Sequence, residues 1–378
     1  MSKKEYLKVF QVAAVFIGTI VGAGLASGAE IRQFFTSFGI TSFISIIICG
    51  LFYIVMCNII SKISIKYQLE SYGDVIHKIS PNFFGKITGG ITTIYLISSA
   101  SIILAGSGAL ISQFFGVPKI IGTLIMILVA IFFLLRGTNG LIEVNSFIVP
   151  TLIFTISLIT ILYFIFNRDS LTLNNILSFT PRKEKGLVLS TILYAGYNIL
   201  CCSGVLVPLS TKVKKKKVMT LGISLGAIGL TMLCLMINLL LTINQPYIYE
   251  LEIPLLLVAK RFSTLLQALL LMVILLEMFS TEVSDVYSIS KTLEKTFNIK
   301  FKKAIFIVLL IAFPISQIGF ANLISTLYPM FGMLSLIFIS QCIIFYFKNK
   351  KSLNSWYKKT TSIIRNGLYF INKVLLFL

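Results

Sequence analysis

Long apolar runs separated by short charged segments dominate this sequence. A helix that crosses a membrane needs about 20 consecutive, mostly apolar residues. Ten runs are long enough or nearly so: 9-36, 40-60, 87-115, 118-135, 144-166, 187-209, 218-243, 264-288, 304-319 and 321-347. Because 57% of the chain is hydrophobic and only 12% is charged, little chain remains outside these runs. The sequence therefore predicts an all-α integral membrane protein and excludes a large catalytic domain outside the bilayer.

The charge of the chain is strongly positive, with 33 Lys and Arg residues against 13 Asp and Glu residues. In a soluble protein such an excess would suggest a nucleic-acid partner. With the N-terminus inside, however, 23 of the basic residues fall in inner segments and five in outer connections. Because basic flanks stay on the cytoplasmic side, we expect a bacterial cell membrane protein with both termini in the cytoplasm. The expected macromolecular environment is the lipid bilayer, without nucleic acid, and the oligomeric state is left open.

The sequence carries no motif of a known catalytic site. It has six Cys residues, all inside apolar stretches and without C-x-x-C spacing, and His77 is its one histidine. Such a pattern indicates neither a disulfide framework nor a zinc site. No H-E-x-x-H, phosphate loop or nucleophile elbow is present. We therefore expect a protein that is not an enzyme and has no cofactor.

The first apolar run is rich in glycine at the depth expected for the middle of the membrane. Gly18, Gly22, Gly24 and Gly28 lie within eleven positions, and each weakens a helix by about 1 kcal/mol relative to Ala. Unwound backbone is tolerated there only if it is buried in protein or lines a cavity. The alternative is close helix packing, because two G-x-x-x-G spacings are present. On the first interpretation, the substrate would contact Gly22, Ala23, Gly24, Ser27 and Gly28.

The sixth run has a similar interruption, about half a chain further on. Within it, Tyr194, Asn198, Ser203 and Gly204 interrupt the apolar pattern. Interrupted helices at corresponding places in two halves are typical of inverted-repeat transporters, in which both breaks contribute to the substrate site. We therefore predict breaks in helices 1 and 6 and add these four residues to the substrate-binding candidates.

Five spans per half give the domain organisation. The first repeat would be 1-166 and the second, inverted repeat 187-347, followed by a basic cytoplasmic tail at 348-378. Apolar residues of the tail fall near one helical face, while Arg365 and Lys373 interrupt the run. This pattern favours an amphipathic helix on the membrane surface over an eleventh span.

The segment Gly18-Thr-Ile-Val-Gly-Ala-Gly-Leu-Ala-Ser-Gly-Ala-Glu-Ile-Arg-Gln-Phe-Phe35 resembles the first helix of the YkvI-like bacterial membrane proteins. More distantly, it resembles the amino acid-polyamine-organocation superfamily, whose fold is the five-plus-five inverted repeat typified by LeuT. The resemblance implies a secondary transporter that works by alternating access, with an amino acid or related amine as substrate. The resemblance does not identify which amino acid or amine this would be.

The eighth run carries unexpected polar residues. Glu277, Ser280 and Thr281 fall on one helical stripe, and a carboxyl group at membrane depth is a candidate for function. In LeuT-like proteins, hydroxyls of the eighth helix and carbonyls of the first break hold sodium, and Ser280-Thr281 resembles that pair. The sodium candidates are therefore Ser280 and Thr281 with the carbonyls of Gly22 and Gly24. The alternative is that these hydroxyls bond to their own helix backbone.

Glu30 departs from the LeuT-like pattern. A helix that restarts near Ala29 would favour an anion at its N-terminus, and in LeuT the substrate carboxylate lies there. Glu30 is therefore either a helix-start residue or a participant in substrate-cation or proton binding. With protons in place of sodium, Glu30 or Glu277 would be the coupling group.

Two functions follow from this sequence. The first is a secondary active transporter of a small organic solute, coupled to sodium or protons. The alternative is a membrane sensor or receptor subunit that keeps the transporter fold and binds a small ligand without sustained flux.

Overall fold

The computed structural model describes residues 2–80, 83–136, 141–166 and 181–350, and all regular structure in them is helical. Ten long segments coincide with the ten predicted spans. They are α1 (Lys3–Ile20) with α2 (Ala23–Ser27) and α3 (Ala29–Phe34), α4 (Thr41–Tyr67), α6 (Phe83–Phe115), α7 (Lys119–Arg136), α8 (Leu141–Phe166), α10 (Leu187–Val213), α11 (Lys216–Thr242), α13 (Thr264–Phe297), α14 (Phe301–Ser316) and α15 (Phe320–Lys348). Shorter elements are η1 (Thr36–Phe38), α5 (Tyr72–Ile79), η3 (Tyr247–Tyr249) and α12 (Pro254–Lys260).

Six of the described helices are long and apolar enough to cross a membrane by length and composition alone. These are α4, α6, α10, α11, α13 and α15. The outward faces of several helices are apolar too: Leu128 of α7 and Leu310 of α14 are 67% and 74% exposed. Large apolar side chains on the outside are what a lipid-facing surface requires.

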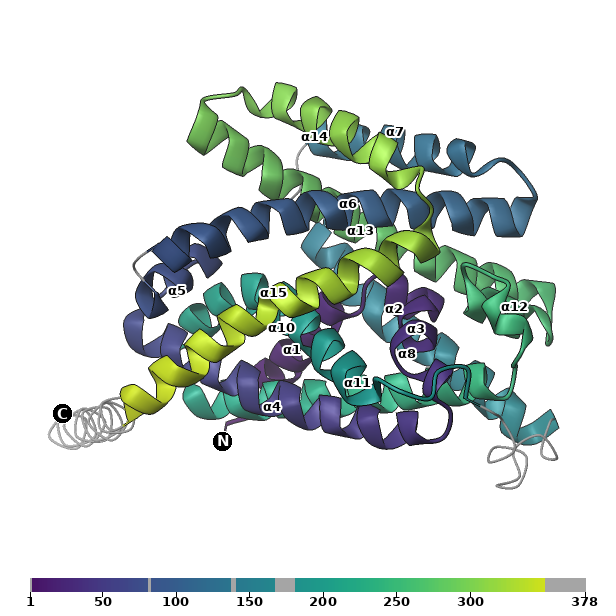
Figure 1. The fold of residues 1–378 in the computed structure, drawn as a ribbon, viewed down its shortest axis with the longest axis horizontal. Helices are drawn as coiled ribbons and strands as arrows, with labels where there is room; N and C mark the ends of the chain where they lie inside the picture. The colour runs from purple at the N-terminus through teal and green to yellow at the C-terminus, as the bar shows by residue number, and fades with distance from the viewer. Residues whose placement is uncertain (1, 81–82, 137–140, 167–180, 351–378) are drawn as a thin grey trace, which may run out of the picture.

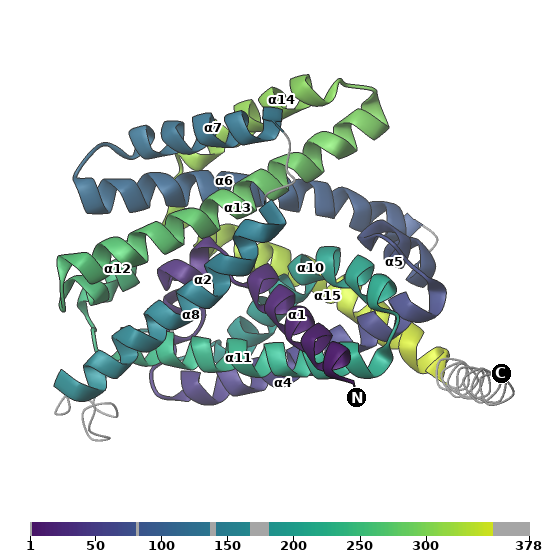
Figure 2. The same ribbon diagram turned by 180° about the vertical axis from the view of Figure 1, so that it is seen from behind.

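The long helices form two groups, which Figures 1 and 2 show from opposite sides. We call α1, α4, α10 and α11 the bundle and α6, α7, α13 and α14 the scaffold, since the helices within each group pack mainly on one another. The scaffold lies at the top of Figure 1 and the bundle below it. Helix α15 contacts α10, α4 and α6, and α8 contacts α13, α11 and α1, so these two connect the groups. Each group takes two helices from each half of the chain, as a five-plus-five repeat requires.

Close packing inside the bundle depends on small residues of α11. Gly222 and Gly226 are spaced like a G-x-x-x-G pair, and both face α1. A Cβ at Gly222 would lie 2.5 Å from Val12 Cβ, and one at Gly226 would lie 3.0 Å from the Ala13 carbonyl oxygen. The absence of side chains at these two positions lets the backbones of α1 and α11 approach closely.

The prediction of a break in the sixth span was wrong. Helix α10 is continuous from Leu187 to Val213. Its polar side chains bond to their own helix: Asn198 Nδ2 donates to the Tyr194 carbonyl at 3.0 Å, and Ser203 Oγ donates to the Ile199 carbonyl at 2.6 Å. Gly196 faces Ser335 and Gly332 of α15. Glycine therefore permits close packing of α10 on α15 and does not unwind the helix.

Part of the predicted tail lies outside the described residues. Helix α15 ends at Lys348, and the amphipathic helix expected within 348-378 falls almost wholly at 351–378, which the structure does not describe. That helix stays a prediction.

Candidate functional site

The first span is broken where the sequence predicts. Helix α1 ends at Ile20, and Val21 and Gly22 have extended backbone conformations before α2 starts. Helix α2 ends at Ser27, and the next residue, Gly28, has a φ of 81°, in the left-handed region that favours glycine. This span is therefore three short helices joined by tight breaks.

The break leaves backbone polar groups of both kinds, carbonyl and N–H, without partners in their own helices. The hydrogen-bond pattern of α1 ends where the Val21 N–H donates to the Ile17 carbonyl at 2.8 Å. The pattern of α2 begins where the Ala26 N–H donates to the Gly22 carbonyl at 2.9 Å. The last carbonyls of α1 and the first N–H groups of α2 thus have no partner within their own helices. The carbonyl end attracts cations and the N–H end attracts anions.

The Glu30 side chain occupies the N–H end of this break. It is 2% exposed, and it lies so close to Gly24 that a methyl group there would collide with its carboxyl group. The Leu25 N–H and the Tyr328 hydroxyl interact with this carboxyl group. The Tyr194 hydroxyl donates to Glu30 Oε2 at 3.0 Å. Glu30 is therefore more than a helix-start residue: its carboxyl group caps α2 from inside the protein.

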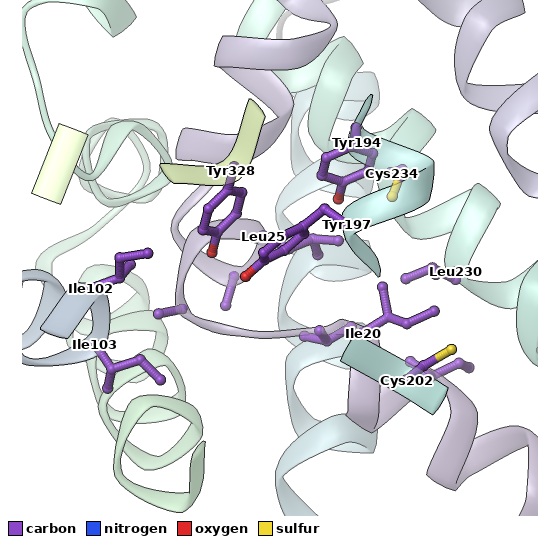
Figure 3. Packing of buried hydrophobic residues seen from close by; sticks show 14 of the residues in the cluster. Ile20, Leu25, Ile102, Ile103, Tyr194, Tyr197, Cys202, Leu230, Cys234 and Tyr328 are labelled. Carbon is purple, nitrogen blue, oxygen red and sulfur yellow. The ribbon is translucent and has the colours of Figure 1, made fainter. Parts of the chain in front are cut away.

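Five rings pack on one another, and two of them, Tyr194 and Tyr328, contact this carboxyl group through their hydroxyls. We call the five rings the aromatic shell: Phe34, Tyr95, Tyr194, Tyr197 and Tyr328. The Tyr197 and Tyr328 rings stack with centroids 4.0 Å apart. Phe34 lies 5.2 Å from Tyr194, and Tyr95 lies 5.7 Å from Tyr197. Figure 3 shows Tyr194, Tyr197 and Tyr328 gathered around Leu25 of α2. The shell takes rings from α3, α6, α10 and α15, so bundle and scaffold both contribute.

Sequence reasoning found part of this arrangement. It identified Gly24, Glu30 and Tyr194, which the structure brings together. It missed Tyr328 and gave no role to Tyr197. The available signal was tyrosine inside otherwise apolar spans, and for Tyr328 also the Pro329 that follows it within α15.

The other substrate-binding candidates lie in varied surroundings. The Ser27 hydroxyl donates to the Gly24 carbonyl at 2.9 Å and accepts from the Ala29 N–H at 3.2 Å, so it joins α2 to α3. Gly22 has open space where a Cβ would be, and Ala23 is buried. Gly204 is exposed on α10. Asn198 and Ser203 are buried with their polar groups bonded inside α10.

The polar residues of α13 lie on the scaffold helix that packs against α2. Glu277 and Ser280 are 3% and 2% exposed. The Thr281 hydroxyl donates to the Glu277 carbonyl at 3.0 Å. This is a bond to its own helix backbone, the alternative to a role in sodium binding. Glu277 Oε2 is buried and has no hydrogen-bond partner in the part of the chain that the structure describes. The described residues contain no group of three or more His, Cys, Asp or Glu side chains that could hold a metal ion.

The segment from η3 to α12, residues 247–260, covers the break on the side away from the chain's N-terminus. The Arg32 guanidinium donates to the carbonyls of Ile248, at 2.6 Å, and Leu251. The Gln113 side chain of α6 pairs with both backbone groups of Ile253, at 2.9 and 3.1 Å. Leu255 of α12 packs directly on Gly28. This segment therefore ties the first span to the scaffold and closes the site in this conformation.

Comparison with known proteins shows where this geometry belongs. A family model described as "Spore germination protein" matches residues 6–323. The chain belongs to this spore germination protein family. "Uncharacterized membrane protein YkvI" of Bacillus subtilis (strain 168) is 31% identical over 333 residues, covering 87% of this chain and 93% of that protein. "Uncharacterized protein YyaD" of the same organism is 26% identical over 88% of this chain and 95% of its own length. The resemblance to YkvI-like membrane proteins is confirmed.

Solved structures confirm the LeuT-type fold of this family member. Mhp1, a nucleobase-cation-symport-1 family transporter, in a closed conformation with bromovinylhydantoin bound, matches with a TM-score of 0.66 at 11% identity. That match covers 88% of this chain and 77% of Mhp1. The Eremococcus coleocola manganese transporter matches with a TM-score of 0.60 at 15% identity, covering 89% and 78%. At such identities the likeness shows the fold alone.

Proposed function

We propose that this family member is a secondary active transporter of a small organic solute, an amino acid or related amine, coupled to sodium or protons. The observation that carries the proposal is the broken first span with the buried Glu30 carboxyl group at the break, in contact with tyrosines of α10 and α15. Broken helices in secondary transporters present backbone carbonyls and N–H groups to ions and substrates near the middle of the membrane. A closed site at a bundle–scaffold boundary suits alternating access.

The proposed cycle follows from which parts enclose the site. The segment held by Arg32 and Gln113 covers one side, and its release would open the break to that side. Movement of the bundle against the scaffold would then close it and open the other side, toward the N-terminal end of α1. The coupling ion would bind between the carbonyl end of α1 and the Glu277–Ser280 face of α13. By the placement of the basic residues, the side toward the N-terminal end of α1 would be the cytoplasm.

The family match favours one further candidate, a ligand sensor without sustained flux. The matched family is described as "Spore germination protein", and a sensor would use the same closed site to bind a ligand. A transporter and a sensor would bind the ligand in the same closed site. They differ in whether the solute crosses the membrane.

Counterflow in proteoliposomes tests the proposal. Vesicles containing the purified protein are loaded with unlabelled solute, and uptake of the labelled solute is followed with and without a sodium or proton gradient. Specific exchange of an amino acid or amine is the expected result. Saturable binding of a ligand without any exchange would instead support the sensor.

A further inference from the structure

We propose that the ligand of this site is a small organic cation, a primary amine without a carboxylate of its own, and not a zwitterionic amino acid. The inference rests on the proposed function only in placing the ligand at the break of the first span. It concerns what the site recognises, and it applies equally to a transporter and to a sensor.

The place for an anion at the break is already taken. The Glu30 carboxyl group interacts with the Leu25 N–H and with the hydroxyls of Tyr194 and Tyr328. These are the donors that a ligand carboxylate would need. A second carboxylate beside Glu30 would find these donors already occupied, and a buried carboxylate without donors is costly, so its binding is disfavoured.

Nearby basic side chains do not offset this. Arg32 is two residues from Glu30, but its guanidinium is bonded to the carbonyls of Ile248 and Leu251. No Lys, Arg or His side chain interacts with the Glu30 carboxyl group in the described part of the chain. The break therefore contains one carboxyl group without a basic partner among the described residues.

Several features of the same place would stabilise a cation. The last carbonyls of α1, at the start of the break, have no partner within their own helix and form its partially negative end. Tyr194 binds Glu30 Oε2, and the other carboxyl oxygen, Oε1, lies over Gly24. Tyr194 and Tyr328 contact the Glu30 carboxyl group through their hydroxyls, and the face of a tyrosine ring attracts an ammonium group. An ammonium group bound beside Glu30 would therefore be attracted by the carboxyl group, by the carbonyl end of α1 and by the neighbouring rings.

The closed conformation indicates how the ligand would enter. Tyr197 and Tyr328 stack face to face at 4.0 Å, from α10 and α15, which leaves no room for a ligand between them. Separation of these two rings would expose two π faces beside Glu30. The ligand would replace the ring–ring contact with two ring–ammonium contacts.

Matched triplets of small molecules test the inference directly. The purified full-length protein in detergent is titrated with phenylalanine, phenethylamine and hydrocinnamate, and with valine, isobutylamine and isovalerate. Ligand binding is read as a rise in the melting temperature. This readout needs no flux, so a protein that binds amines without counterflow would contradict transport and leave this inference standing.

We expect the amine of at least one triplet to stabilise the protein, while its amino acid and its acid do not at equal concentration. In Glu30→Gln the amine should bind at least about tenfold more weakly, since truncating one partner of a buried charge pair is costly. The control is Glu282→Gln, which removes a fully buried carboxyl group of α13 that has no hydrogen-bond partner among the described residues; it should retain amine binding. Stronger binding of the amino acid than of its amine, stabilisation by no compound in either triplet, or equal binding in Glu30→Gln would each overturn the inference.

Discussion

Tyr194 donates its hydroxyl hydrogen to Glu30 across 3.0 Å, and this bond joins the two halves of the chain at a fully enclosed position. Tyr194 lies on α10 and Glu30 on α3, 164 residues apart in sequence, and each is 2% exposed. Because water does not reach the pair, a lost partner cannot be replaced by solvent. The bond therefore fixes the carboxyl group and also ties the first span to the sixth.

Replacing Tyr194 with Phe should lower the free energy of unfolding by about 1–3 kcal/mol, the cost of leaving a buried polar group without its partner. The measurement is thermal or denaturant unfolding of the purified protein. Tyr247→Phe is the control, because that residue is 54% exposed and its hydroxyl can bond to water. Equal stability of the two variants would show that the Tyr194 bond contributes little.

Gly24→Ala should displace the Glu30 carboxyl group, since the added methyl would collide with it. Overpacking of this kind costs about 1–3 kcal/mol. At Gly22 there is open space around a Cβ, so Gly22→Ala should cost about 1 kcal/mol or less, the loss of a favourable N-cap residue. The two variants are compared by unfolding. In a Glu30→Ala background the Gly24→Ala cost should largely disappear, and an unchanged cost there would place the clash elsewhere.

The break in the first span was predictable from sequence, while the continuity of α10 was not. Both spans carry glycine together with small polar residues, and composition alone does not distinguish unwinding from close packing. In the first span the backbone at Gly28 is left-handed, a conformation that favours glycine and ends α2. In α10, Asn198 and Ser203 bond to carbonyls four residues back, and the helix continues. What separates the cases is the neighbour: Gly196 has α15 against it, and that contact is set by tertiary structure. The shell residue Tyr328 was missed for the same reason, because its partners come from α3 and α10.

The packing role of glycine at the α10–α15 contact gives a matched pair of variants. A Cβ at Gly332 would lie 2.5 Å from the Leu193 carbonyl oxygen, a backbone atom that cannot rotate away. Gly332→Ala should therefore destabilise the protein by about 1–3 kcal/mol. Gly204 of α10 has open space, so Gly204→Ala should be neutral or stabilising by up to about 1 kcal/mol, because Ala favours the helix. Destabilisation by Gly204→Ala alone would contradict this assignment.

Acid should weaken the start of α5, a short helix outside the spans. Partial burial acts to raise the pKa of Asp74, but hydrogen bonds from Ser71 and from the Glu70 backbone N–H outweigh it and hold the pKa below its usual value. A carboxyl group with a lowered pKa contributes stability that is complete above its unfolded pKa, about 3.9, and is lost as pH falls through its folded pKa. Hydrogen exchange in α5 should therefore be faster at pH 3 than at pH 6 after correction for the intrinsic rate. Asp74→Asn should be fast at both pH values, and an equal pH response in that variant would exclude Asp74 as the cause.

The segment over the break should be released more by loss of Gln113 than by loss of the nearby ion pair. Gln113 satisfies both the N–H and the carbonyl of Ile253, so Gln113→Ala leaves two backbone groups without their partner. Lys119 and Glu252 are 2.9 Å apart, but the lysine side chain is 56% exposed, and exposed ion pairs contribute little. We expect Gln113→Ala to accelerate hydrogen exchange in α12 at least about fivefold, and Lys119→Ala to change it by less than about threefold. If Lys119→Ala had the larger effect, the ion pair and not Gln113 would hold the segment closed.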